Sequence, residues 1–161
     1  MPNIYWVDGA GIGRLAIVQR PRIATDYMAL KEAGIDVLVS MLEREEAHRA
    51  GLSSAPHYCR DAGIAFHSQP ITDFGLPTTI EPMEMLARHL LAELRAGKGV
   101  AAHCYAGLGR SPLMIATVLV EAGLDASEAC GLLSEARGEN VPEMPTQVRW
   151  LENYQQRRER G

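Results

Sequence analysis

The chain has 161 residues, with 16 lysine and arginine side chains against 20 aspartate and glutamate side chains, and a formal net charge of −4. This length predicts a single domain over residues 1–161, and an apolar content of 47% is ordinary for a globular protein. The negative charge, without a basic stripe, argues against nucleic acid as a partner, and the lack of an eighteen-residue apolar run argues against a membrane span.

The cysteines and histidines indicate where the protein is located and whether it binds a metal. The three cysteines, Cys59, Cys104 and Cys130, are odd in number and do not suit a disulfide framework. No charged-then-apolar leader is recognisable at the first residues. The five histidines show no metal-ligand spacing. We therefore expect a cytoplasmic monomer that needs neither a metal nor a cofactor and does not act at a membrane.

The first part of the chain predicts a hairpin, a helix and a strand. Apolar runs at residues 4–7 and 15–18 are joined by the glycine-rich segment 9–13. This segment lacks the spacing of a dinucleotide loop and is followed by a strand-like run, so we interpret it as a hairpin turn. Residues 25–33 predict a helix, and the apolar run 35–41 predicts a buried strand.

The remainder alternates between strand-like and helix-like patterns. A strand-like run covers residues 64–71, and Thr79 is a candidate cap for a helix whose apolar residues recur at helical spacing. A short apolar strand is expected at 100–103, followed by helices at 112–120, 127–137 and 145–158. This alternation predicts an α/β protein with a central, mostly parallel sheet flanked by helices.

The most informative stretch joins the strand at 100–103 to the helix at 112–120. It reads His-Cys-Tyr-Ala-Gly-Leu-Gly-Arg-Ser, from His103 to Ser111. Pro112 fits the first turn of a helix, so the free amides of that turn should point back into the loop. Backbone N–H groups at a helix start favour anions, and the loop is therefore predicted to bind phosphate.

Each residue type in this loop has a chemical reason to be there. Cys104 is a nucleophile only as a thiolate, which the helix start and a nearby arginine stabilise. Gly107 and Gly109 let the backbone take a positive φ or approach a ligand closely. Arg110 can hold two phosphate oxygens with its planar fork, and Ser111 can donate a hydrogen bond to the sulfur.

The motif His-Cys-x5-Arg-Ser resembles that of the cysteine-dependent protein tyrosine phosphatases. Its interior is most similar to the compact dual-specificity branch, and the resemblance extends over residues 35–154. It implies a phosphatase fold in which the Cys-x5-Arg loop lies between a strand and a helix. It also implies that Cys104 forms a phosphocysteine, that Arg110 clamps the phosphoryl group and that His103 shapes the loop. The implied phosphate-binding residues are Tyr105, Ala106, Gly107, Leu108, Gly109 and Arg110.

Such an enzyme needs an acid to protonate the leaving oxygen. Asp73, in the string Asp-Phe-Gly-Leu-Pro, resembles the acid of the family and is our candidate general acid and base. The alternative is that Asp73 is only a turn residue, a common use of aspartate. Other acidic clusters lie in helix-like surroundings and are expected to be solvated faces: Glu43, Glu45 and Glu46, and Asp125 with Glu128.

A segment near the C-terminus, residues 143–151, resembles the family segment that positions the water for hydrolysis of the phosphocysteine. Gln147 matches one family glutamine. Glu143 stands where tyrosine-specific members carry the water-positioning glutamine, so Asp73 alone could activate the water. The alternative for Gln147 is a polar residue on an amphipathic final helix.

The resulting hypothesis is a protein phosphatase that acts on phosphotyrosine, and on phosphoserine or phosphothreonine if the pocket admits them. A phosphoinositide or inositol-phosphate phosphatase is one alternative, although the loop carries none of the lysines that match extra phosphates. A non-catalytic phosphopeptide-binding module is the other. Both stay open at this point.

Overall fold

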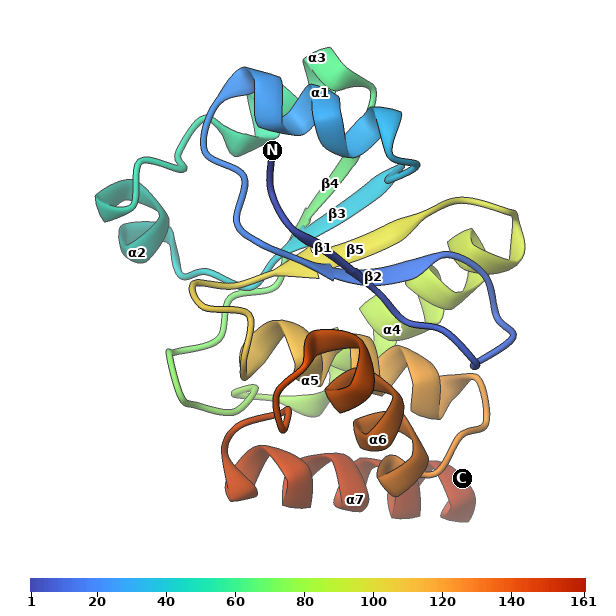
Figure 1. Ribbon diagram of the computed structural model, residues 1–161. Helices are drawn as coiled ribbons and strands as arrows, with labels where there is room; N and C mark the ends of the chain where they lie inside the picture. The colour runs from blue at the N-terminus through green and yellow to red at the C-terminus, as the bar shows by residue number, and fades with distance from the viewer.

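A computed structural model describes all 161 residues. Its helices pack around one sheet (Figure 1). The first half contains β1 (Ile4–Trp6), β2 (Leu15–Val18), α1 (Ala24–Glu32), β3 (Val37–Ser40), α2 (Arg44–Arg49), α3 (Ala55–Ala62) and β4 (Ala65–Ser68). The second half contains α4 (Ile80–Arg95), β5 (Val100–His103), α5 (Arg110–Glu121), α6 (Ala126–Arg137) and α7 (Pro145–Arg160).

The five strands form one sheet in the order β1-β2-β5-β3-β4. Strand β1 pairs antiparallel with β2, and the pairs β2-β5, β5-β3 and β3-β4 are parallel. The prediction of a mostly parallel sheet is therefore confirmed. Strand β5 lies at its centre, so the loop that follows β5 emerges from the carboxyl edge of the parallel strands, where α/β proteins place their ligands.

Helices cover both faces of the sheet, which explains why the central strands are short apolar runs without polar alternation (Figure 1). Helices α1 and α3 pack on one face over a core that includes Val18, Leu38 and Ala101. Helices α4 to α7 pack on the other face over the larger core, which includes Ile17, Val39 and Ala102. All twelve residues of α5 are buried, because this helix lies between the sheet and the other helices of its layer.

Most of the predicted elements are present near their expected bounds. The hairpin of β1 and β2 is confirmed, and so is α4, although Thr79 at its start makes no capping bond with its side chain. Helix α2 has only six residues and none of them is buried, so it gave no clear periodic pattern. No helix has the length and the apolar character that crossing a membrane would require.

Candidate active site

The loop from Cys104 to Gly109 joins the end of β5 to the start of α5. Its conformation depends on two glycines in different ways. Gly107 has a φ of +76°, a region that favours glycine. Gly109 has a φ of −128°, but a Cβ built there would lie 3.0 Å from the side-chain amide of Gln147. Gly107 therefore has the expected positive φ, whereas Gly109 lies close to the Gln147 side chain and its expected approach to a ligand stays a prediction.

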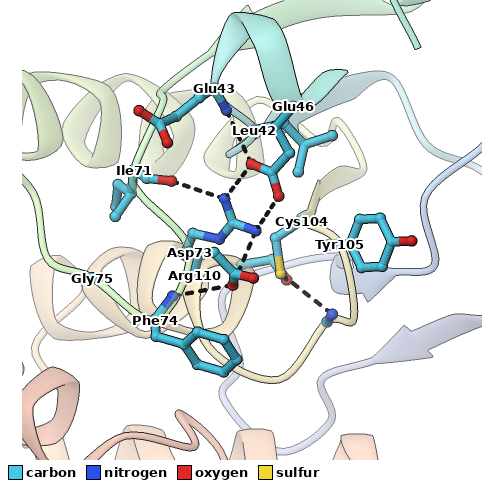
Figure 2. A network of polar contacts seen from close by, with 12 residues as sticks. Leu42, Glu43, Glu46, Ile71, Asp73, Phe74, Gly75, Cys104, Tyr105 and Arg110 are labelled. Carbon is cyan, nitrogen blue, oxygen red and sulfur yellow. Dashed lines mark hydrogen bonds and ion pairs between the residues drawn. The ribbon is translucent and has the colours of Figure 1, made fainter. Parts of the chain in front are cut away.

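The sulfur of Cys104 lies inside this loop, with the residue only 3% exposed (Figure 2). The backbone N–H of Gly107 donates a hydrogen bond to Sγ over 3.3 Å. The hydroxyl of Ser111 lies 3.2 Å from the same sulfur and is itself fully buried. The N–H of Gly107, the hydroxyl of Ser111 and the N-terminal end of α5 thus face the sulfur.

Arg110 is 1% exposed and is held by groups from two distant segments. Its Nη1 donates to Glu46 Oε1 over 2.7 Å and to the carbonyl of Ile71 over 2.8 Å, and its Nη2 donates to Glu46 Oε2 over 2.8 Å. Burial alone would lower the pKa of Arg110, but Glu46, Cys104 and Asp73 outweigh it and raise this pKa. The buried Nε has no hydrogen-bond partner, so one donor stays free for a ligand.

Glu46 corrects an expectation from the sequence. Its cluster was expected to be a solvated face, and this is wrong for Glu46, whose side chain is 16% exposed and paired with Arg110 through both oxygens. Glu45 does lie in solvent. The hydrogen bond from Arg110 is the main reason why the pKa of Glu46 is lowered. The two partners are 64 positions apart in the chain, so no local pattern could have revealed the pair.

The segment that carries Asp73, residues 72–75, is a tight turn beside Arg110 (Figure 2). The N–H of Gly75 donates to the carbonyl of Thr72 over 2.7 Å, and the Asp73 carboxylate lies 3.2 Å from Nη2 of Arg110. Phe74 follows with a φ of +63°, which is unusual for a bulky residue. The structure thus brings Asp73, half-exposed at 52%, to the mouth of the phosphate loop.

The two C-terminal candidates lie in different environments. Gln147 is fully buried in the first turn of α7, and its Nε2 donates to the carbonyl of Gly75 over 3.2 Å. The side chain of Glu143 is exposed, and only its backbone N–H contacts the phosphate loop, through the carbonyl of Leu108 at 2.7 Å. Gln147 therefore belongs to the site, while Glu143 has no side-chain contact in it.

His103 ends β5 and is 1% exposed. Its Nδ1 lies 3.3 Å from the carbonyl of Cys104, and since a carbonyl only accepts, this nitrogen carries the proton. Burial lowers the pKa of His103 to about 4. A neutral imidazole therefore supports the start of the loop. No group of three or more histidine, cysteine, aspartate or glutamate side chains is arranged to hold a metal ion.

Two arginines that the sequence analysis did not single out bind the outer side of the loop. Arg20 donates to the carbonyl of Tyr105 over 2.7 Å and its guanidinium lies 3.9 Å from the centre of the Tyr105 ring. Arg137 donates to the carbonyls of Gly107 and Ala106, each over 3.2 Å. Three consecutive carbonyls of the loop are thus held by arginine side chains, while the N–H of Gly107 donates to the sulfur of Cys104.

The mouth of the loop opens into a hollow of about 300 Å³. Its walls include Glu46 and Arg49 of α2, Asp73 of the turn and Tyr105 of the loop. Tyr105 is 48% exposed, and Phe74 on the turn is 57% exposed. Tyr105 is therefore the one aromatic side chain in the lining of this hollow, while Phe74 is not part of the lining.

Comparison with known proteins agrees with this geometry. A family model described as a polymorphic toxin system DSP-PTPase phosphatase matches residues 10–124. This range includes β5, the phosphate loop and the whole of α5. The chain therefore belongs to the DSP-PTPase family of phosphatases, whose members are cysteine-based hydrolases, as the motif predicted.

Individual relatives support the same family. The protein tyrosine phosphatase PRL-1 of Leishmania major is 33% identical over 107 residues, which are 61% of this chain and 59% of that protein. The chain spans about three fifths of the length of this relative and of cyclin-dependent kinase inhibitor 3 of Rattus norvegicus, which is 27% identical over 137 residues.

Two solved structures have the same fold. The kinase associated phosphatase, crystallised with serine in place of its catalytic site cysteine, has a TM-score of 0.88 at 22% identity, over 97% of this chain and 95% of its own. The structure of PTPMT1 in complex with PI(5)P has a TM-score of 0.76 at 21% identity, over 94% and 96% of the two chains.

Proposed function

We propose that this protein hydrolyses phosphate monoesters of protein side chains, phosphotyrosine first, through a phosphocysteine formed on Cys104. In this proposal Arg110 holds the phosphoryl group, Asp73 serves as general acid and then as general base, and Ser111 stabilises the sulfur. The observation that carries it is the buried sulfur of Cys104, which faces the N–H of Gly107 and the hydroxyl of Ser111 at a helix start.

The first step transfers the phosphoryl group to the enzyme. The Cys104 thiolate attacks phosphorus, the bond from phosphorus to the ester oxygen breaks, and Asp73 gives its proton to that oxygen. The free Nε of Arg110 and the backbone N–H groups of the loop would supply donors for the phosphoryl oxygens. An incoming phosphoryl dianion competes with Asp73 for Nη2 of Arg110, which releases the carboxyl group toward the leaving oxygen.

The second step regenerates the enzyme. Asp73, now ionised, accepts a proton from a water molecule that attacks the phosphorus of the phosphocysteine. The bond between phosphorus and sulfur breaks, inorganic phosphate leaves, and the hydroxyl of Ser111 donates to the sulfur as its negative charge returns. No metal is required in either step.

The choice of phosphotyrosine rests on the lining of the hollow. Its one aromatic lining residue is Tyr105, which is 48% exposed. An aromatic side chain in such a position stabilises a bound aryl phosphate by packing against its ring, and an alkyl phosphate would offer less contact. A phenol is also the better leaving group, so phosphoserine and phosphothreonine should depend more strongly on Asp73.

The test is the hydrolysis of para-nitrophenyl phosphate between pH 4 and 9 without added metal, for the wild type and for Cys104→Ser, Asp73→Asn and Glu143→Gln. We expect a bell-shaped profile for the wild type and no turnover for Cys104→Ser. Asp73→Asn should lose the basic limb of the profile, because the protonated acid is missing. Glu143→Gln should resemble the wild type, since the side chain is exposed and contacts nothing in the site.

Other outcomes would select the alternatives. Phosphate or phosphopeptide binding without turnover of any ester would make the protein a binding module. Faster turnover of inositol phosphates or phosphoinositides than of phosphopeptides would assign it to that class of substrate. Equal profiles for Asp73→Asn and the wild type would mean that Asp73 is only a turn residue.

A further inference from the structure

Gln147 joins three parts of the site that are far apart in the chain. The residue is fully buried in the first turn of α7. Its Oε1 accepts a hydrogen bond from the N–H of Met144 over 3.3 Å, and its Nε2 donates to the carbonyl of Gly75 over 3.2 Å. Its amide also lies against the backbone of Gly109 in the phosphate loop.

The orientation of this amide follows from its partners. The N–H of Met144 can only donate, and the carbonyl of Gly75 can only accept. Rotating the amide by half a turn would set donor against donor and acceptor against acceptor. The contact with Met144, at the start of α7, therefore directs the NH2 group of Gln147 toward the turn that carries Asp73.

This turn needs such support because its conformation is strained. Phe74 occupies a positive φ of 63°, which glycine or asparagine adopts more readily than a bulky aromatic residue. Gly75 cannot be replaced easily, since a Cβ there would lie 2.8 Å from the carbonyl of Thr72. A strained, exposed turn keeps one conformation only when contacts from outside hold it.

We propose that Gln147 is a positioning residue for the general acid: its hydrogen bond to Gly75 holds the turn of residues 72–75 so that Asp73 faces the phosphate loop. This role differs from the positioning of the hydrolytic water that the family segment suggested. The kinetic part of the inference rests on the proposed function, because it takes Asp73 to be the general acid. The structural part, the fixing of the turn, does not.

The kinetic test compares two substrates with different leaving groups, para-nitrophenyl phosphate and phenyl phosphate. A displaced acid affects the poorer leaving group more, since that group needs the proton. We expect Gln147→Leu to lower kcat/KM for phenyl phosphate roughly tenfold more than for para-nitrophenyl phosphate, as partial loss of general acid catalysis implies. Equal losses on both substrates, with phosphocysteine accumulating in rapid-quench experiments, would overturn the proposal in favour of a water-positioning role.

A second measurement is independent of catalysis. In hydrogen–deuterium exchange of the full chain, Gln147→Leu should speed exchange in residues 71–77 by roughly fivefold to tenfold, as loss of one buried hydrogen bond predicts. Unchanged exchange in this segment would contradict the proposal even if the protein hydrolysed nothing. Conversely, faster exchange in a protein without turnover would refute only the proposed function.

A matched control lies on the same helix. Gln155 also bridges two elements, accepting from the N–H of Ala126 over 2.7 Å, but it is remote from the turn. Gln155→Leu should leave both the ratio of the two substrates and the exchange of residues 71–77 unchanged. The rate of alkylation of Cys104 by iodoacetate, followed against pH, reports whether each variant retains an intact phosphate loop.

Discussion

The phosphate loop and the turn of Asp73 face one another across the site, yet they are built in opposite ways. The loop is buried, its sulfur is surrounded by groups within seven residues of Cys104, and it continues directly into a buried helix. The turn is half-exposed, contains a strained Phe74 and relies on Arg110 and Gln147 from distant segments. The surroundings of the sulfur are thus local in the chain, whereas the position of the Asp73 turn depends on contacts from distant segments.

After the loss of Cys104 itself, the largest effect should come from Arg110, which follows the loop and also contacts the turn. Arg110→Lys keeps one positive charge but loses the planar fork that Glu46 binds through both oxygens. We expect kcat/KM for para-nitrophenyl phosphate to fall on the order of 10³-fold. Activity within tenfold of the wild type would show that a point charge is sufficient in this loop.

A smaller loss is expected at Glu46, which holds Arg110 from outside the loop. Glu46→Gln removes the closer and less exposed of the two carboxylates that pair with the buried guanidinium. Activity should fall roughly 10²-fold, and the free energy of unfolding in urea by about 2 to 3 kcal/mol. The control is Glu45→Gln, because Glu45 is exposed on the same helix. If both variants behaved alike, the pair with Arg110 would not fix the loop.

The loop should also make stability depend on pH through His103. Its folded pKa of about 4 lies below the ordinary value of 6.5, because burial disfavours the charged ring. This contribution is complete above pH 6.5 and is lost as the pH falls toward 4, since only the unfolded chain takes up the proton.

Between pH 6.5 and 5 the free energy of unfolding should therefore fall by about 2 kcal/mol. His103→Asn should flatten this interval in urea titrations, while replacement of the exposed His48 by asparagine should leave it unchanged. An equally steep decline in the His103 variant would assign the pH dependence to other groups.

The smallest effect is expected from a substitution at the contact between the phosphate loop and Gln147, which binds the turn of Asp73. Gly109→Ala would place a Cβ about 3.0 Å from the amide of Gln147, which must then shift. We expect roughly a fivefold loss on phenyl phosphate, from a displacement that costs about 1 kcal/mol. Gly131→Ala on α6 meets nothing within 4 Å and should keep full activity. Equal activity of the two variants would mean that the Gln147 contact tolerates displacement.

The difference between local and long-range contacts also explains which parts of the site could be predicted from the sequence. The motif of the phosphate loop occupies nine consecutive residues, from His103 to Ser111. It therefore identified the family and located the site between a strand and a helix. The mostly parallel sheet followed from the alternation of apolar strands and helices. Glu46 was not predicted, because its partner lies 64 positions away and its helix has only six residues. The bond from Gln147 to Gly75 spans 72 positions, and the bonds from Arg20 and Arg137 to the loop span 85 and 30 positions.

The small size of helix α2 has a consequence for how the protein loses activity on warming. It has six residues and none of them is buried, yet it carries the carboxylate that holds Arg110. Short, solvent-exposed helices open locally at a lower free energy than the core. Warming should therefore disable the site through transient opening of α2 while the sheet stays intact. The working lifetime of the enzyme would then be set by this small helix, and stiffening it should lengthen that lifetime without any change to the core.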